Sequence, residues 1–294
     1  MRYNSTLFSN FVANSTQNNE NNKLMKRLLV SIVIMATSIV SIYAQKKLVL
    51  YYSETGTTKT VAEELQKQLS ADIEVIECVK PYSGNFNETM QRGQREMQSN
   101  EWPELKPLKS KLANYDVIFL GYPIWFGTYA NPIQTLVKNN DFAGKTIVPF
   151  CTFGSGGLNT STDALKKALP KATIKEGYGV RTARVAAAAK ELDRFLKENG
   201  YKKGTVEKLP DFSAQKPVTD AEKTIFNDAC SSYQFPLGTP STVGSRKTSD
   251  GMEYKFTVKS GGFGGGGGGG GESIIYVVVG KEAGAKPEFT QVVR

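Results

Sequence analysis

The chain has 294 residues, a formal net charge of +9 and no histidine, which excludes Ser-His-Asp triads and metal sites built on imidazole. The basic surplus is spread thinly along the chain, so it gives no support for a nucleic-acid or anionic membrane surface. The three cysteines lack CxxC spacing, which excludes zinc knuckles and thioredoxin-type motifs; they are Cys78, Cys151 and Cys230. The sequence therefore assigns neither a catalytic side chain nor a metal site.

The N-terminal 44 residues are typical of a targeting segment. Residues 1–24 are rich in Asn and Ser and have no hydrophobic period, so we expect them to be disordered and to lie upstream of the true start at Met25. Residues 25–44 have the basic start, short apolar stretch and small final residue, Ala44, of a signal peptide. We expect export to the periplasm, with an uncleaved N-terminal membrane anchor as the alternative.

Residues 46–200 alternate short apolar runs with helical patterns, which predicts an α/β domain. Strands are expected at residues 47–53, 73–79, 116–122, 146–151 and 173–180. Helices are expected to contain Val61, Leu65 and Leu69, to cover 87–98, to begin at 132–137, and to cover 162–169 and 186–197. This alternation indicates a parallel sheet with right-handed crossovers, and five strands fit the doubly wound order 2-1-3-4-5.

The expected strand order indicates a binding site before any motif is considered. In a doubly wound sheet a ligand binds at the carboxyl ends of the strands, beside the switch between strands 1 and 3. The loops that follow Ser53, Tyr122 and Cys151 lie at this place. We therefore expect these three loops to form one site.

The first loop has the composition of a phosphate-binding turn. Its sequence is Ser53-Glu54-Thr55-Gly56-Thr57-Thr58, between a hydrophobic strand and a helix. The hydroxyls of Ser53, Thr55 and Thr58 can donate to phosphate oxygens, and the helix N-terminus adds favourable partial charge. Gly56 lets the backbone turn so that successive N–H groups converge. A Ser/Thr cap in an ordinary strand–helix turn is the alternative interpretation.

Three segments carry a resemblance to a known family. They are YYSETGTTKTVAEEL at 51–65, GYPIWFG at 121–127 and PFCTFGSGG at 149–157. In order and spacing they resemble the phosphate loop and the two flavin-flanking loops of flavodoxins. The chain is most similar to a bacterial flavodoxin-like subfamily with a GYPIWxG signature, in which Trp is usual at the position of Phe126. The resemblance implies a flavodoxin-like fold that binds FMN.

The resemblance also implies a role for each loop. Trp125 and Phe126 would supply an aromatic face for the flavin, the Gly127–Thr128 peptide would bind flavin N5, and the glycines of the third loop would approach the pyrimidine edge. Ordinary loop packing is the alternative for Trp125 and Phe153. The implied cofactor-binding residues are Ser53, Glu54, Thr55, Gly56, Thr57, Thr58, Pro123, Ile124, Trp125, Phe126, Gly127, Thr152, Phe153, Gly154, Ser155 and Gly157.

After a linker at 201–209, residues 210–294 have the pattern of a small α+β domain. A helix is expected at 219–232, capped by Thr219 or Asp220 with Glu222 in a capping box. Extended segments are expected at 237–246, 252–260, 273–279 and 289–293, and the Gly-rich stretch 261–271 is expected to be a flexible hairpin tip. One helix against a curved antiparallel sheet resembles the cystatin-like arrangement.

Three functions are compatible with these features. The first is an FMN-dependent electron carrier whose partner is a redox protein or a small-molecule acceptor. The second is an FMN-dependent NAD(P)H or quinone reductase, although no GxGxxG motif is present. The third is an exported binding protein that uses the flavodoxin unit as a scaffold. Familiar flavodoxin shuttles are acidic, whereas this chain is basic, which argues against a general shuttle.

A cysteine thiol beside a flavin is a candidate redox group. Cys151 lies at a strand end beside the expected flavin, but it has no basic neighbour in sequence to lower its pKa, so a buried hydrophobic role is favoured. Cys78 and Cys230 are candidates for a disulfide in an oxidising compartment.

Overall fold

The computed structural model describes residues 45–233, 237–259 and 271–293. The segment expected to be disordered, the expected signal peptide at 25–44 and residues 261–270 of the Gly-rich stretch therefore lie outside the described residues. None of the described helices is long and apolar enough to cross a membrane.

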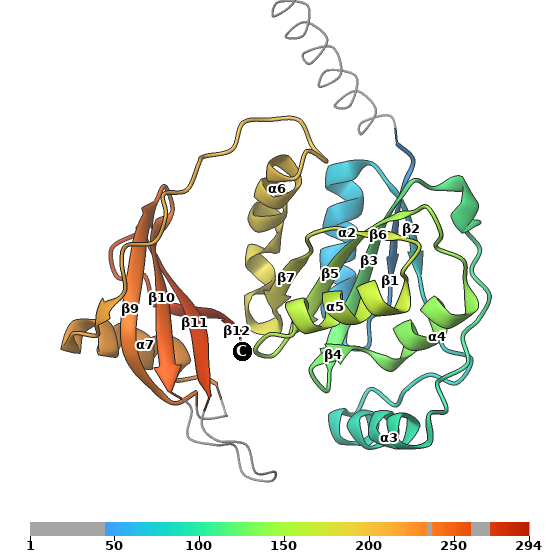
Figure 1. Cartoon of the computed structure of the whole chain (residues 1–294), viewed down its shortest axis with the longest axis horizontal. Helices are drawn as coiled ribbons and strands as arrows, with labels where there is room; N and C mark the ends of the chain where they lie inside the picture. Colours follow the sequence, from blue (N-terminus) through green and yellow to red (C-terminus); the bar gives the residue numbers. More distant parts are fainter. Residues whose placement is uncertain (1–44, 234–236, 260–270, 294) are drawn as a thin grey trace, which may run out of the picture. The chain divides into compact units, whose positions relative to one another are not determined.

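The first part of the chain folds as a parallel sheet in the order β2-β1-β3-β5-β6 (Figure 1). These strands are β1 Lys47–Tyr51, β2 Asp72–Val75, β3 Val117–Trp125, β5 Thr146–Phe153 and β6 Thr173–Ile174. All four pairings between these neighbours are parallel. The predicted doubly wound order 2-1-3-4-5 is therefore confirmed.

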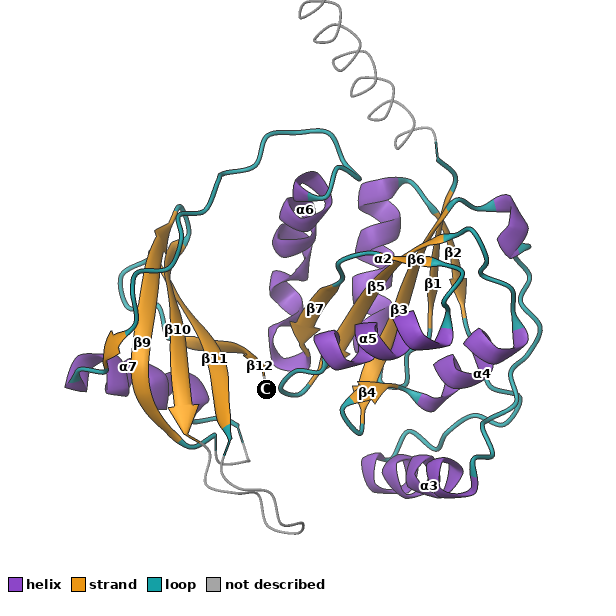
Figure 2. Cartoon of the chain, in the orientation of Figure 1, coloured by secondary structure: helices purple, strands orange, loops and turns teal. Residues whose placement is uncertain are grey.

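Helices cover both faces of this sheet (Figure 2). They are α2 Thr57–Leu69, α3 Phe86–Ser99, α4 Asn131–Asn139, α5 Leu158–Ala168 and α6 Ala188–Glu198, with short 3-10 turns η1 Leu112–Asn114 and η2 Thr182–Ala187. Helices α2 and α6 contact each other on one face. The central strands β1, β3 and β5 are almost fully buried between the helices, which explains their apolar sequences.

Two predicted strands differ from the observed ones. The second strand ends at Val75 instead of residue 79, and Cys78 instead forms an isolated antiparallel bridge with Leu105. The strand predicted at 173–180 is divided into β6 and β7 Tyr178–Arg181, which both pair with β5. Between them the chain passes so close to β5 that a Cβ on Gly177 would lie 2.7 Å from the Pro149 carbonyl oxygen.

The C-terminal part forms a five-stranded antiparallel sheet in the order β12-β11-β10-β9-β8. Its elements are β8 Lys216–Pro217, helix α7 Asp220–Cys230, β9 Thr239–Thr248, β10 Gly251–Lys259, β11 Glu272–Gly280 and β12 Glu288–Val293. The predicted capping box is present, because Thr219 and Glu222 each accept from the other's backbone N–H. The short strand β8 was not predicted.

The C-terminal part has an apolar core of its own. Phe226 of α7 lies edge-on to Phe256 of β10, with ring centroids 5.2 Å apart, and both side chains are buried. Strands β10 and β11 pair along their whole length, from Gly251 opposite Gly280 to Lys259 opposite Glu272. The domain boundaries and the cystatin-like resemblance stay predictions.

Candidate cofactor site

The three predicted loops meet at one edge of the parallel sheet. Strands β1, β3 and β5 are neighbours, so the loops that follow them start side by side. The Thr58 and Thr152 hydroxyls, from the first and third loops, are 2.8 Å apart. A Cβ on Gly157 would lie 2.7 Å from the Ile124 side chain, so the second and third loops also touch. The structure thus brings the three loops together as expected.

The first loop presents an open helix N-terminus. Gly56, the N-cap residue of α2, has φ 88°. Because glycine has no side chain, this residue cannot cap the helix with a side-chain hydrogen bond. The Ser53 hydroxyl accepts from the Lys59 amide at 3.2 Å, so one helical amide is satisfied by a side chain, as the capping interpretation expects. The hydroxyls of Thr55 and Thr57 lie 3.4 Å apart near the surface, and both can reach an incoming anion.

Thr58 and Glu54 have different positions from those of the other members of the first loop. The Thr58 side chain is buried, and its hydroxyl is shared with Thr152. The Glu54 carboxylate accepts from the Tyr52 hydroxyl and, at 3.1 Å, from the Gly84 amide. These bonds direct its negative charge toward residue 84, so Glu54 serves to hold the loop in place.

The second loop is a tight hairpin turn. Strand β3 continues to Trp125 and pairs with β4 Thr128–Tyr129, so the strand is longer than predicted. Phe126 and Gly127, at the turn, have φ values of 49° and 82°. Two successive positive φ values are typical of two-residue hairpin turns, but they are rare for phenylalanine. The structure therefore holds Phe126 in an uncommon backbone conformation at the predicted site.

The two aromatic residues of this turn have opposite environments. Phe126 is 44% exposed, whereas Trp125 is 7% exposed. The Trp125 ring packs edge-on against Tyr52 and Tyr82, with centroid distances of 5.9 and 5.0 Å. Phe126 is thus the solvent-accessible aromatic side chain of this turn. Trp125 is packed in the protein interior and stabilises the turn.

The peptide predicted to bind flavin N5 has an unusual neighbour. The Thr128 hydroxyl is buried and has no hydrogen-bond partner within the described residues. Gly127 has open space where a side chain would be, and its carbonyl oxygen faces the third loop, 3.4 Å from the Cβ position of Gly157. A buried hydroxyl without a partner among the described residues, next to a glycine with no side chain, fits a site that binds a polar group.

The third loop is partly open and partly packed. Gly154 is exposed and has open space at its Cβ position, whereas Gly157 has φ 114° and precedes α5. Phe153 is buried against Gly179 and does not cover the loops from outside. Trp125 and Phe153 are thus both packed within the protein, and their contacts with a flavin stay a prediction.

The part of the chain that carries the three loops matches a known protein family. A family profile described as Flavodoxin matches residues 46–197, more than half of the chain. The chain belongs to the flavodoxin family. A comparison with curated proteins gives no match.

Solved structures similar to this chain include three that are described as flavoproteins. A candidate flavoprotein from Bacteroides eggerthii has 33% identity and a TM-score of 0.43, and the match covers 51% of this chain and 98% of that chain. One from Bacteroides uniformis has 29% identity and a TM-score of 0.46, with the same coverage. A flavoprotein from Lactobacillus acidophilus in complex with FMN has 23% identity and a TM-score of 0.43, covering 46% of this chain and 93% of that chain.

The sequence patterns did not indicate Arg181 as a residue of the site. Its side chain is 7% exposed, and its Nε donates to the Gly154 carbonyl oxygen at 2.8 Å. Arg181 is the last residue of β7, so it lies at the carboxyl edge where ligands bind in doubly wound sheets. That rule, applied to the last strand as well, would have indicated it.

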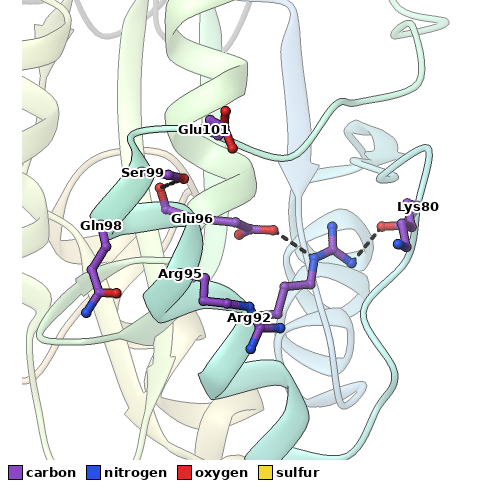
Figure 3. A pocket seen from close by; sticks show the side chains of 7 residues that line it. All are labelled: Lys80, Arg92, Arg95, Glu96, Gln98, Ser99 and Glu101. Carbon is purple, nitrogen blue, oxygen red and sulfur yellow. Dashed lines mark hydrogen bonds and ion pairs between the residues drawn. The ribbon is translucent and has the colours of Figure 1, made fainter.

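A charged pocket lies beside α3, and none of its lining residues belongs to the three loops (Figure 3). It is lined by Lys80, Arg92, Arg95, Glu96, Gln98, Ser99 and Glu101. Arg92 pairs with Glu96 at 2.7 Å, donates to the Lys80 carbonyl at 3.0 Å and lies over the Tyr82 ring. These contacts fix Tyr82, against which Trp125 packs, so this pocket supports the second loop indirectly.

The cysteines of this flavodoxin are all free thiols, so the Cys78–Cys230 pair is not formed. Burial raises the pKa of the Cys78 and Cys230 thiols to about 12, and burial raises that of Cys151 well above its usual value. We expect iodoacetamide at pH 8 to label the cysteines slowly in the native protein. In the urea-unfolded protein we expect it to label all three cysteines rapidly. Mass spectrometry measures the extent of labelling at each cysteine. Fast labelling of native Cys151 would contradict its burial.

Proposed function

We propose that the chain binds FMN at the three loops and transfers electrons through the bound flavin. The observation that carries this proposal is the meeting of an open helix N-terminus, an exposed aromatic turn and a glycine-containing loop at one sheet edge. Membership of the flavodoxin family and a similar flavoprotein crystallised with FMN support the choice of cofactor.

Each part of the proposed ligand would be bound by a different group of residues. The amides at the start of α2 and the hydroxyls of Thr55 and Thr57 would hold the phosphate. Phe126 would cover the apolar ring, and the Gly127 carbonyl would meet its polar edge. When bound, FMN supplies one- and two-electron chemistry that no side chain here provides. The protein would bind and orient the ring and control its access to water.

The proposal extends to location and partners. We infer export to the periplasm from the signal-like segment 25–44, and a redox protein or small acceptor as partner. The reductase alternative would need an NAD(P)H or quinone site, and the scaffold alternative would need no flavin. The basic charge favours an acidic partner.

An anaerobic redox titration of the purified protein tests the proposal. We expect the protein to be yellow, or to take up FMN with quenched flavin fluorescence, and to be reduced in two resolved one-electron steps. A single two-electron step with quinone turnover would favour the reductase instead. A colourless protein that does not bind added FMN would leave only the scaffold alternative.

A further inference from the structure

Two successive carbonyl groups of the third loop accept hydrogen bonds from Arg181 and from strand β12. Arg181 donates through Nε to the Gly154 carbonyl oxygen at 2.8 Å. The Val292 amide, from β12, donates to the Ser155 carbonyl oxygen at 2.7 Å. The C-terminal strand therefore contacts a loop that the proposed function assigns to the flavin.

Arg181 joins the loop to this strand. Its Nη1 donates to the Phe289 carbonyl oxygen at 2.9 Å, and the guanidinium carbon lies 4.0 Å from the centre of the Phe289 ring. Within the described residues its charge is met by carbonyl groups and aromatic rings, and no carboxylate is paired with it. The N–H donors of one buried guanidinium group, on Arg181 of β7, thus bond to both the third loop and β12.

Strand β12 is shaped for this contact. It is an edge strand, and its pairing with β11 shifts by one residue so that Thr290 is left unpaired. Such a bulge bends a strand and changes the direction of its groups. The fit to the loop is close, since a Cβ on Gly156 would lie 2.3 Å from the Val292 carbonyl oxygen.

The bound carbonyl groups determine where the loop amides point. In a trans peptide the C=O and the following N–H point in opposite directions. With the carbonyls of Gly154 and Ser155 directed toward Arg181 and Val292, the amides of Ser155 and Gly156 point away from them. Neither amide donates to another protein group within the described residues.

We propose that Arg181 and strand β12 are positioning elements that hold the third loop so that its amides face the flavin. This inference rests on the proposed function and adds that flavin binding and docking of the C-terminal strand are coupled. Coupling is reciprocal: if β12 helps the loop to bind FMN, FMN strengthens the docking of β12 by the same factor.

Matched pairs of full-length variants test the coupling. Val292→Pro removes the N–H that bonds to Ser155, whereas Val292→Ala shortens the same side chain and keeps the N–H. Arg181→Gln removes the guanidinium group and its positive charge, whereas Arg181→Lys removes the guanidinium group and keeps a positive charge. We expect Val292→Pro and Arg181→Gln to weaken FMN binding about tenfold, the size of one lost hydrogen bond, and the two conservative variants to weaken it much less.

Hydrogen exchange at the Val292 amide provides the second readout, with far-UV circular dichroism to confirm folding. We expect FMN to slow this exchange in the unaltered chain, and Arg181→Gln to accelerate it, with partial rescue by Arg181→Lys. If Val292→Pro does not fold, the Arg181 pair decides. Unchanged FMN affinity in Arg181→Gln, together with faster exchange at Val292, would overturn the coupling.

The two proposals fail in different ways. If the unaltered chain does not bind FMN, the proposed function fails. Exchange measured without FMN still decides the link itself: acceleration at Val292 in Arg181→Gln supports the bridge, and unchanged exchange overturns it.

Discussion

The double variant Thr55→Ala/Thr57→Ala should lose at least about 100-fold in affinity for FMN and almost none for riboflavin. Each lost hydrogen bond to a charged phosphate costs about 1.5–3 kcal/mol, and about 1.4 kcal/mol corresponds to a tenfold change. Both hydroxyls lie near the surface and neither is needed by the protein core. Fluorescence titration with the two ligands measures the difference.

Thr60→Ala is the matched control for this prediction. It removes a hydroxyl from the same helix, but that hydroxyl donates to the Gly56 carbonyl at 3.3 Å. We expect it to change FMN affinity by less than about threefold, because no phosphate bond is lost. Equal losses for FMN and riboflavin in the double variant would show that this loop does not hold a phosphate.

Gly121→Ala should cause a large loss of stability. Gly121 and Phe150 are directly opposite each other on β3 and β5, and a Cβ on Gly121 would lie 2.1 Å from the end of the Phe150 ring. Phe150 is buried, so the ring has little room to move. Overpacking of this kind costs about 1–3 kcal/mol, or more where the backbone must shift. Urea unfolding followed by circular dichroism measures this loss.

Gly154→Ala provides the matched control for stability. Its Cβ would meet no atom within 4 Å, and its backbone is not left-handed. We expect its free energy of unfolding to change by less than about 0.5 kcal/mol. The double variant Gly121→Ala/Phe150→Leu should regain part of the loss, since a smaller side chain leaves room for the new methyl. Additive effects in the double variant would contradict a direct clash.

The parallel sheet and the meeting of the three loops were predictable because they depend on hydrophobic patterns. Buried central strands need continuous apolar runs, and these runs are distinct between residues 47 and 153. Once the strand order was inferred, the positions of the loops followed from the general rule for doubly wound sheets. Local sequence was sufficient for this level of the structure.

The orientation of single side chains was less predictable. Whether Trp125 or Phe126 faces a ligand depends on the positive φ values of the Phe126–Gly127 turn, and a sequence of two aromatic residues does not determine them. Glu54 was expected in the phosphate site, but its carboxylate is held by Tyr52 and Gly84. Such contacts depend on parts of the chain that are distant in sequence.

The role of Arg181 was the least predictable. It depends on contacts with Gly154 and Phe289, which lie on opposite sides of it in the chain: Gly154 follows β5 of the parallel sheet, and Phe289 belongs to β12 of the antiparallel sheet. No periodicity or motif relates these positions. Only the general rule for strand ends points to one of the two contacts.

The two edges of the antiparallel sheet affect how the protein behaves at high concentration. An open sheet edge is a template on which another chain can add a strand. One edge is β8, which has two residues, one of them Pro217 without an N–H, and the other edge is β12, whose Val292 amide is bonded to the third loop. Within the described residues, the sheet therefore offers little free backbone to a second molecule, which protects it against aggregation by strand addition.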